Sequence, residues 1–237
     1  MVDTSADGIR KDARAAMKGH LEALGGFDIE PQAVANRECL EALSKVGELC
    51  REEGAGGEAN RTALGEAGGV GIIARFLGGD EADSSADGVV VAAMSTLHDA
   101  CKNDARNRDA FIYTNMAQLN SLLLRWTSEV DPTSTGEAND AEETQDRGVV
   151  GGRGGGATEG GSGSAATAAG LKVVRTVCTK TEENKGSFMR HKGAAVLTRA
   201  LERFGSGEGK DAAVTREACG ALRSVTLGDD RRKDFSG

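Results

Sequence analysis

The chain has 237 residues, only two prolines and eight aromatic residues, and a formal net charge of −8. Strand-rich folds depend on aromatic and β-branched residues, so this composition favours helices and predicts an all-α fold. Residues 129–164 carry eight acids against two arginines, which leaves a net charge of only −2 on the other 201 residues. Those residues lack the strongly basic stripe that phosphate backbones require, so we do not expect nucleic acid as a partner.

The five cysteines show no CxxC pair, no histidine at zinc-binding spacing and an odd total. Neither a disulfide framework nor a metal site is predicted, and no cofactor is expected. Reduced thiols are typical of the cytosol and the nucleus. Residues 1–18 alternate in charge without an apolar core, and no later segment approaches the ~18 apolar residues of a membrane span. We therefore expect a cytoplasmic or nuclear protein that does not cross a membrane.

Two helices are predicted at the N-terminal end. Apolar residues at helical spacing between residues 7 and 24 indicate an amphipathic helix that stops at Gly25-Gly26. We assign residues 1–30 to this helix and expect it to cap the rest of the chain. Because proline suits a first helical turn, a second helix is expected from Pro31 to about Glu52.

A short pattern of asparagine, a basic residue and an apolar residue returns along the chain. The copies are Asn60-Arg61-Thr-Ala-Leu64, Asn107-Arg108-Asp-Ala-Phe111, Asn184-Lys185-Gly-Ser-Phe188 and, in variant form, Arg231-Arg232-Lys-Asp-Phe235. The last position falls at 64, 111, 188 and 235, so the steps are 47, 77 and 47 residues. Such a period is typical of stacked helical repeats.

Two further elements repeat in phase with the first. Residues 69–77, 116–124 and 193–201 predict a second helix, and a longer third helix closes each unit. The third helix carries a pattern of five residues that recurs as Val46-Gly-Glu-Leu49-Cys50, Leu97-His-Asp-Ala100-Cys101, Val174-Arg-Thr-Val177-Cys178 and Leu222-Arg-Ser-Val225-Thr226. One unit thus has helices near 60–66, 69–78 and 88–102. No unit buries its apolar stripes alone, so neighbours must stack into one body spanning residues 1–237.

The 77-residue step exceeds the 47-residue step by 30 residues, which fall between Trp126 and Ala165. This surplus is rich in Asp, Glu and Thr and then in glycine. It has little apolar surface whose burial could offset the loss of conformational entropy on folding. We predict that residues 129–164 are a disordered loop. The chain stops at Gly237 inside a further copy of the pattern, so we expect a C-terminus truncated within a repeat.

Three phrases resemble the armadillo repeat family. They are the Asn-Arg/Lys pair of the first helix, Gly-Gly-Val or Gly-Ala-Ala before Leu77 and Leu201, and the run Cys219-Gly-Ala-Leu222-Arg-Ser-Val225-Thr226. The resemblance covers roughly residues 35–128 and 165–237. It implies a right-handed α-solenoid of three-helix repeats that binds proteins along a concave surface lined by third helices. The implied function is a non-catalytic scaffold or adaptor.

The resemblance also indicates where a partner would bind. Peptide-binding members of the family carry an asparagine two residues after the first aliphatic position of the third-helix pattern. Other polar residues stand at those places here, which argues against an importin-like hold on extended basic peptides. With their neighbours they change the expected groove from acidic to basic along its length. The candidate partner-binding residues are Glu48, His98, Asp99, Arg175, Thr176, Arg223 and Ser224.

Other functions have weaker support in the sequence. Cysteines 50, 101 and 178 share one repeat position, which favours small buried packing residues over reactive thiols. The run 69–74 fits a loose dinucleotide fingerprint but does not follow a strand, so it indicates a helix junction. No convergent acid, base or nucleophile is evident, and we predict no enzyme and no catalytic residue. Two alternatives remain open: RNA association through Gly-Gly-Arg153-Gly-Gly, and an inactive fragment of a longer scaffold. We expect a monomer.

Overall fold

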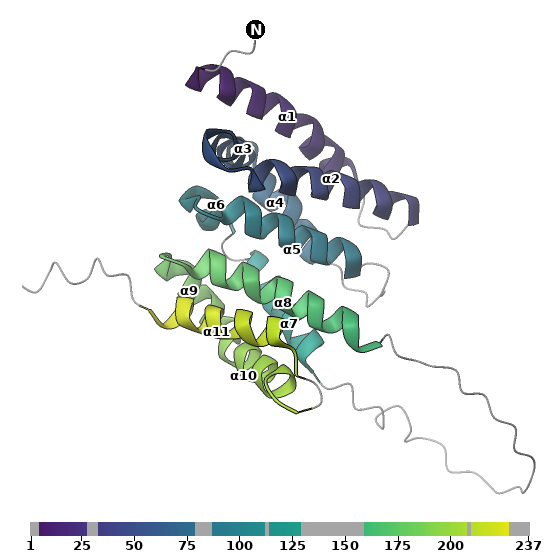
Figure 1. The fold of residues 1–237 in the computed structure, drawn as a ribbon, viewed down its shortest axis with the longest axis vertical. Helices are drawn as coiled ribbons and strands as arrows, with labels where there is room; N and C mark the ends of the chain where they lie inside the picture. The colour runs from purple at the N-terminus through teal and green to yellow at the C-terminus, as the bar shows by residue number, and fades with distance from the viewer. Residues whose placement is uncertain are drawn as a thin grey trace, which may run out of the picture.

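A computed structural model describes residues 5–27, 33–78, 87–111, 114–128, 159–207 and 210–227. These residues form eleven α-helices and one 3-10 helix, with no strand among them, which confirms the all-α prediction for this part of the chain. The elements are α1 (Ala6–Gly26), α2 (Ala33–Arg51), α3 (Gly54–Glu66), α4 (Gly69–Ala74), η1 (Arg75–Leu77), α5 (Asp87–Cys101), α6 (Ala105–Ala110), α7 (Thr114–Thr127), α8 (Glu159–Cys178), α9 (Glu182–Arg190), α10 (Gly193–Phe204) and α11 (Ala212–Thr226) (Figure 1).

Four helices lie side by side in the order α2, α5, α8 and α11, and each packs on the next (Figure 1). We call them the row helices. After α2 the chain forms three consecutive triplets, each of which ends in a row helix: α3-α4-α5, α6-α7-α8 and α9-α10-α11. Helix α1 lies beyond α2 and contacts α2, α3 and α4, at the end of the row where the sequence predicts a cap.

One hydrophobic core runs through all three triplets, from Met17 and Leu24 in α1 to Ala218 in α11. The last position of the recurring first-helix pattern belongs to it, since Leu64, Phe111 and Phe188 are each 0% exposed. Burial of one such side chain stabilises the fold by about 1.5–3 kcal/mol relative to leaving it in water. The recurring apolar position therefore marks residues that hold the stack together.

The recurring cysteines are core residues, as the sequence predicts. Cys50, Cys101 and Cys178 are at most 1% exposed. Burial raises the pKa of the Cys50 and Cys178 thiols to about 12, and it raises that of Cys39 to about 11. These thiols stay protonated and enclosed, which makes them poor nucleophiles. Cys219 alone is exposed among the five cysteines.

Two helices begin earlier than predicted. Helix α3 starts at Gly54, and the backbone of Gly57 in its first turn lies against the Glu52 carbonyl group, in a space that no Cβ atom could share. Helix α8 starts at Glu159, so residues 159–164 are helical and the prediction of a disordered loop is wrong there. Ser164 Oγ donates to Asp211 Oδ2 at 2.8 Å, a contact with the start of α11 that local composition does not reveal.

The rest of that predicted loop, residues 129–158, lies outside the described residues, as do 228–237, where the sequence predicts a truncated repeat. The described part of the predicted N-terminal cap ends at Phe27. None of the helices formed by the described residues is both long and apolar enough to cross a membrane.

Candidate protein-interaction surface

A buried asparagine in each triplet holds the C-terminal end of a row helix. Its Nδ2 atom donates to the carbonyl group of the residue just before the recurring cysteine. The pairs are Asn60 with Leu49 (2.9 Å), Asn107 with Ala100 (2.9 Å) and Asn184 with Val177 (2.8 Å). The last four carbonyl groups of a helix have no partner within that helix, so these amides satisfy groups that would otherwise be orphaned.

Two of the asparagines reach a second helix as well. Asn107 Nδ2 donates to the Arg61 carbonyl at 2.9 Å, and Asn184 Nδ2 donates to the Arg108 carbonyl at 2.9 Å. Each amide thus ties both the first and the third helix of the preceding triplet. We call Asn60, Asn107 and Asn184 the asparagine ladder. A slip between triplets would leave buried carbonyl groups unpaired, so the ladder fixes the first helix of each triplet against the helices that precede it.

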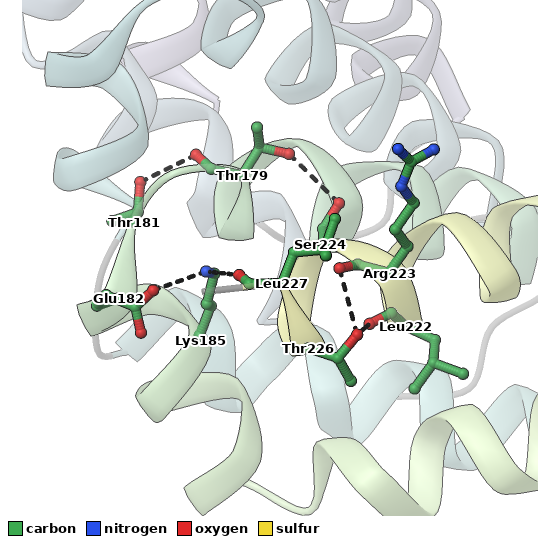
Figure 2. Close-up of polar contacts among 9 residues, drawn as sticks. All are labelled: Thr179, Thr181, Glu182, Lys185, Leu222, Arg223, Ser224, Thr226 and Leu227. Carbon is green, nitrogen blue, oxygen red and sulfur yellow. Dashed lines mark hydrogen bonds and ion pairs between the residues drawn. The ribbon is translucent and has the colours of Figure 1, made fainter. Parts of the chain in front are cut away.

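The basic residue after each asparagine also binds the end of a row helix. Arg61 Nη1 donates to the Cys50 carbonyl at 2.6 Å, and Arg108 Nη1 donates to the Cys101 carbonyl at 3.3 Å. In the last triplet Lys185 Nζ donates instead to the Leu227 carbonyl just beyond α11 and pairs with Glu182 (Figure 2). A cation at a helix C-terminus also complements the helix dipole. Helix capping therefore explains why the two polar positions recur together.

Of the candidate partner-binding residues, Glu48 on α2 is exposed, as a groove residue should be. Its carboxylate pairs with Lys45 Nζ at 3.0 Å and accepts a hydrogen bond from Ser44. The bond from Lys45 lowers the pKa of Glu48. A partner at this end of the row therefore meets a weak, solvent-exposed ion pair without net charge rather than an isolated acid.

The structure corrects the sequence interpretation of Asp99. Its side chain is only 8% exposed, and Oδ2 lies 2.7 Å from Arg51 Nη2 of α2. The two helices approach closely because α2 carries Gly47, where an added Cβ would lie 3.3 Å from Thr96 Oγ1. Asp99 therefore fastens α5 to α2, and its carboxylate is not offered to a partner.

His98 and Thr176 meet across the next pair of row helices. His98 Nδ1 lies 2.7 Å from Thr176 Oγ1, and the Thr176 hydroxyl donates to the Lys172 carbonyl at 2.9 Å. Because that hydroxyl hydrogen is already used, His98 Nδ1 is the donor in the first bond. Burial, reinforced by the charge of Lys172, lowers the pKa of His98 from 6.5 to about 4. The imidazole is therefore neutral at pH 7 and joins α5 to α8.

We expect the free energy of unfolding to fall by about 1–2 kcal/mol between pH 7 and pH 5 because of His98. The unfolded chain takes up a proton below about pH 6.5, whereas folded His98 stays neutral until about pH 4. Urea unfolding at both pH values measures this loss. His98→Gln keeps a donor for Thr176 and should remove the difference; if the variant retains the whole pH dependence, another group is responsible.

Between α8 and α11 two of the predicted residues, Arg175 and Ser224, each contact the neighbouring helix. Arg175 Nη1 lies 3.1 Å from Glu217 Oε2 as an ion pair that lacks the alignment of a hydrogen bond. Arg175 crosses α11 at Gly220, where an added Cβ would lie 2.6 Å from Arg175 Cδ. Ser224 Oγ lies 3.3 Å from Thr179 Oγ1 (Figure 2). Arg175 and Ser224 thus serve helix packing as well as lining the surface.

Unpaired cations gather on the last two row helices. Lys172 on α8 is half-buried, and Arg216 and Arg223 on α11 are exposed. None of the three has an acid within ion-pair distance among the described residues. Among the described residues, α2 therefore carries a paired acid and base, whereas α8 and α11 carry unpaired cations, so the basic end of the predicted charge gradient is present and the acidic end is not. We call Lys45, Glu48, His98, Lys172 and Thr176 the row surface.

The described residues contain no group of three or more His, Cys, Asp or Glu side chains that could hold a metal ion. Arg153 and the glycine-rich tract around it, on which the RNA alternative depends, lie outside the described residues.

No family model matches the chain, and no curated protein matches it. The crystal structure of an engineered protein aligns with 94% of this chain and 92% of its own, with 15% sequence identity and a TM-score of 0.45. A likeness of this degree carries no argument about fold or function. Function is therefore inferred from the residues of the chain itself and from their contacts.

Proposed function

We propose that the chain is an armadillo-type α-solenoid that acts as a non-catalytic adaptor and holds a protein partner along the row surface. The proposal is supported by the four row helices, which lie side by side (Figure 1), and by the polar row-surface residues on α2, α5 and α8. The asparagine ladder ties the first helices of successive triplets together, α6 to α3 and α9 to α6. A rigid row of this kind can receive an extended segment without reorganising, which reduces the entropic cost of binding.

Charge indicates which kind of segment would bind. Lys172 is the one row-surface residue with an uncompensated charge among the described residues, since Lys45 and Glu48 pair with each other. A partner segment with a carboxylate near α8 and neutral polar groups near α5 complements this pattern. The bonds of His98, Thr176 and Asp99 are made within the protein. They hold α5 against its neighbours and offer no charge to a partner.

We expect Lys172→Glu to abolish recovery of the partner from a eukaryotic lysate while leaving the helical circular dichroism spectrum unchanged. A like charge at a binding surface opposes the approach of an acidic segment. Recovered proteins are identified by mass spectrometry in parallel with wild type. Arg190→Glu, at an exposed arginine on α9, makes the same charge change away from the row and serves as the control.

The assignment would fail if wild type and Lys172→Glu recovered the same proteins in the same amounts. Loss of the same proteins with Arg190→Glu would show instead that net charge decides recovery. We expect the adaptor to act as a monomer in the cytoplasm or the nucleus, and sedimentation and fractionation of the tagged protein test both points.

A further inference from the structure

The outer face of α11 is uncovered at positions that are buried in every other row helix. The nine equivalent residues of α2, α5 and α8 are at most 1% exposed: Leu43, Val46, Cys50, Met94, Leu97, Cys101, Leu171, Val174 and Cys178. In α11 the same three positions hold Cys219, Leu222 and Thr226, all of which are exposed, Leu222 to 43%. These three positions form a packing interface in the other row helices, but in α11 no described residue covers them.

The cause is the place of α11 in the row. Each of α2, α5 and α8 carries the next row helix, whereas no described element follows α11. Ser224 points to Thr179 of α8, and the Leu222 side chain leaves α11 on the other side (Figure 2). The face that carries Leu222 is therefore a continuation of the established helix-to-helix interface, and Cys219 and Leu222 are its exposed apolar side chains.

The charges on this face indicate what would cover it. Arg223 follows Leu222 just as Arg175 follows Val174, so the two arginines occupy equivalent positions. Arg175 is met by Glu217 from the next row helix. Arg223 has no acid within ion-pair distance among the described residues, and Arg216, earlier in α11, is also exposed and unpaired there.

We propose that the outer face of α11, formed by Arg216, Cys219, Leu222, Arg223 and Thr226, binds an amphipathic helix of a partner protein. That helix presents small aliphatic side chains to Leu222 and a carboxylate to Arg223, in the way that α11 itself docks on α8. A second copy of this chain is a poorer fit, because two such faces would oppose arginine to arginine. The outer face of α11 is distinct from the row surface, and its assignment does not rest on the proposed function.

A peptide with the sequence of α11 is a suitable probe, because α11 itself packs on the equivalent face of α8. The probe is a fluorescein-labelled peptide with the sequence of residues 212–226, held helical by a hydrocarbon staple that replaces its Cys219 and Arg223. Both replaced positions lie away from the face that contacts α8. Its Glu217 would then meet Arg223 of the intact protein. Fluorescence anisotropy measures binding to the full chain.

We expect saturable binding that is weakened about tenfold by Glu217→Lys in the peptide and about tenfold by Arg223→Glu in the protein. Combining the two changes should restore most of the affinity, because the ion pair is re-formed with its charges exchanged. Peptide binding should also slow alkylation of Cys219, the one exposed cysteine, which reports contact with the face directly. Leu222→Asp should remove binding, and Arg190→Glu should leave it unchanged.

Three results would overturn the proposal. They are no saturable binding, equal affinity for wild type and Arg223→Glu, and a dimer in sedimentation that Leu222→Asp converts to a monomer. The last would assign the face to a second copy of the chain. Lys172→Glu should leave peptide binding intact, so failure of the row-surface proposal and failure of this one give different results.

Discussion

Phe188→Ala is expected to lower the free energy of unfolding by about 3–5 kcal/mol. The ring is 0% exposed and belongs to the core between the last two triplets. Gly193, at the start of α10, lies directly against the ring, so the backbone there is already as close as it can come. The cavity left by the substitution therefore cannot collapse, and the loss includes both the transfer of the ring to water and the empty volume.

Urea unfolding followed by circular dichroism measures the effect. Met189→Ala is the matched control, because Met189 is the next residue of α9 and is 48% exposed. We expect the control to change stability by less than about 0.5 kcal/mol. Similar losses for the two variants would show that the Phe188 ring does not anchor α9 in the core.

Asn184→Ala is expected to cost about 2–4 kcal/mol, since it removes the donor for two buried carbonyl groups at once. Those groups belong to Val177 at the end of α8 and Arg108 in α6. Alanine fits the space and suits a helix, so the loss measures the hydrogen bonds rather than a steric conflict. Thermal unfolding monitored by circular dichroism gives the shift in midpoint.

Glu183→Ala provides the comparison, because Glu183 precedes Asn184 in the same helix and is exposed. Equal midpoints for the two variants would contradict the structural importance of the asparagine ladder. A larger loss for Asn184→Ala, together with faster amide hydrogen exchange at the end of α8, would support it.

Much of the fold can be predicted from the sequence because its apolar residues recur with a fixed period. The last positions at Leu64, Phe111 and Phe188 are core residues, and the third helix predicted at 88–102 is observed as Asp87–Cys101. The start of α8 is not evident in the sequence because glycine and serine lower local helix propensity, whereas the contact of Ser164 with Asp211 depends on a helix 47 residues away.

The candidate surface is harder to predict, since sequence position alone does not tell an exposed polar residue from one that joins two helices. Asp99 and Glu48 stand at equivalent positions of the pattern, yet Asp99 is buried against Arg51 and Glu48 is exposed. The recurrence of asparagine at 60, 107 and 184 is visible in the chain, but nothing local indicates that its amide caps a neighbouring helix. A polar residue that returns at the period of the core is the signal that could have found this role.

The asparagine ladder also determines how this protein would come apart. Asn107 and Asn184 each donate from one triplet to the triplet before it, so a triplet that unfolds withdraws the caps from the helices of its predecessor. Loss of order would therefore travel along the row toward α1, in the direction opposite to chain growth. During synthesis the carbonyl groups at the end of a row helix stay without these hydrogen bonds until the asparagine of the next triplet has been made and folded against them.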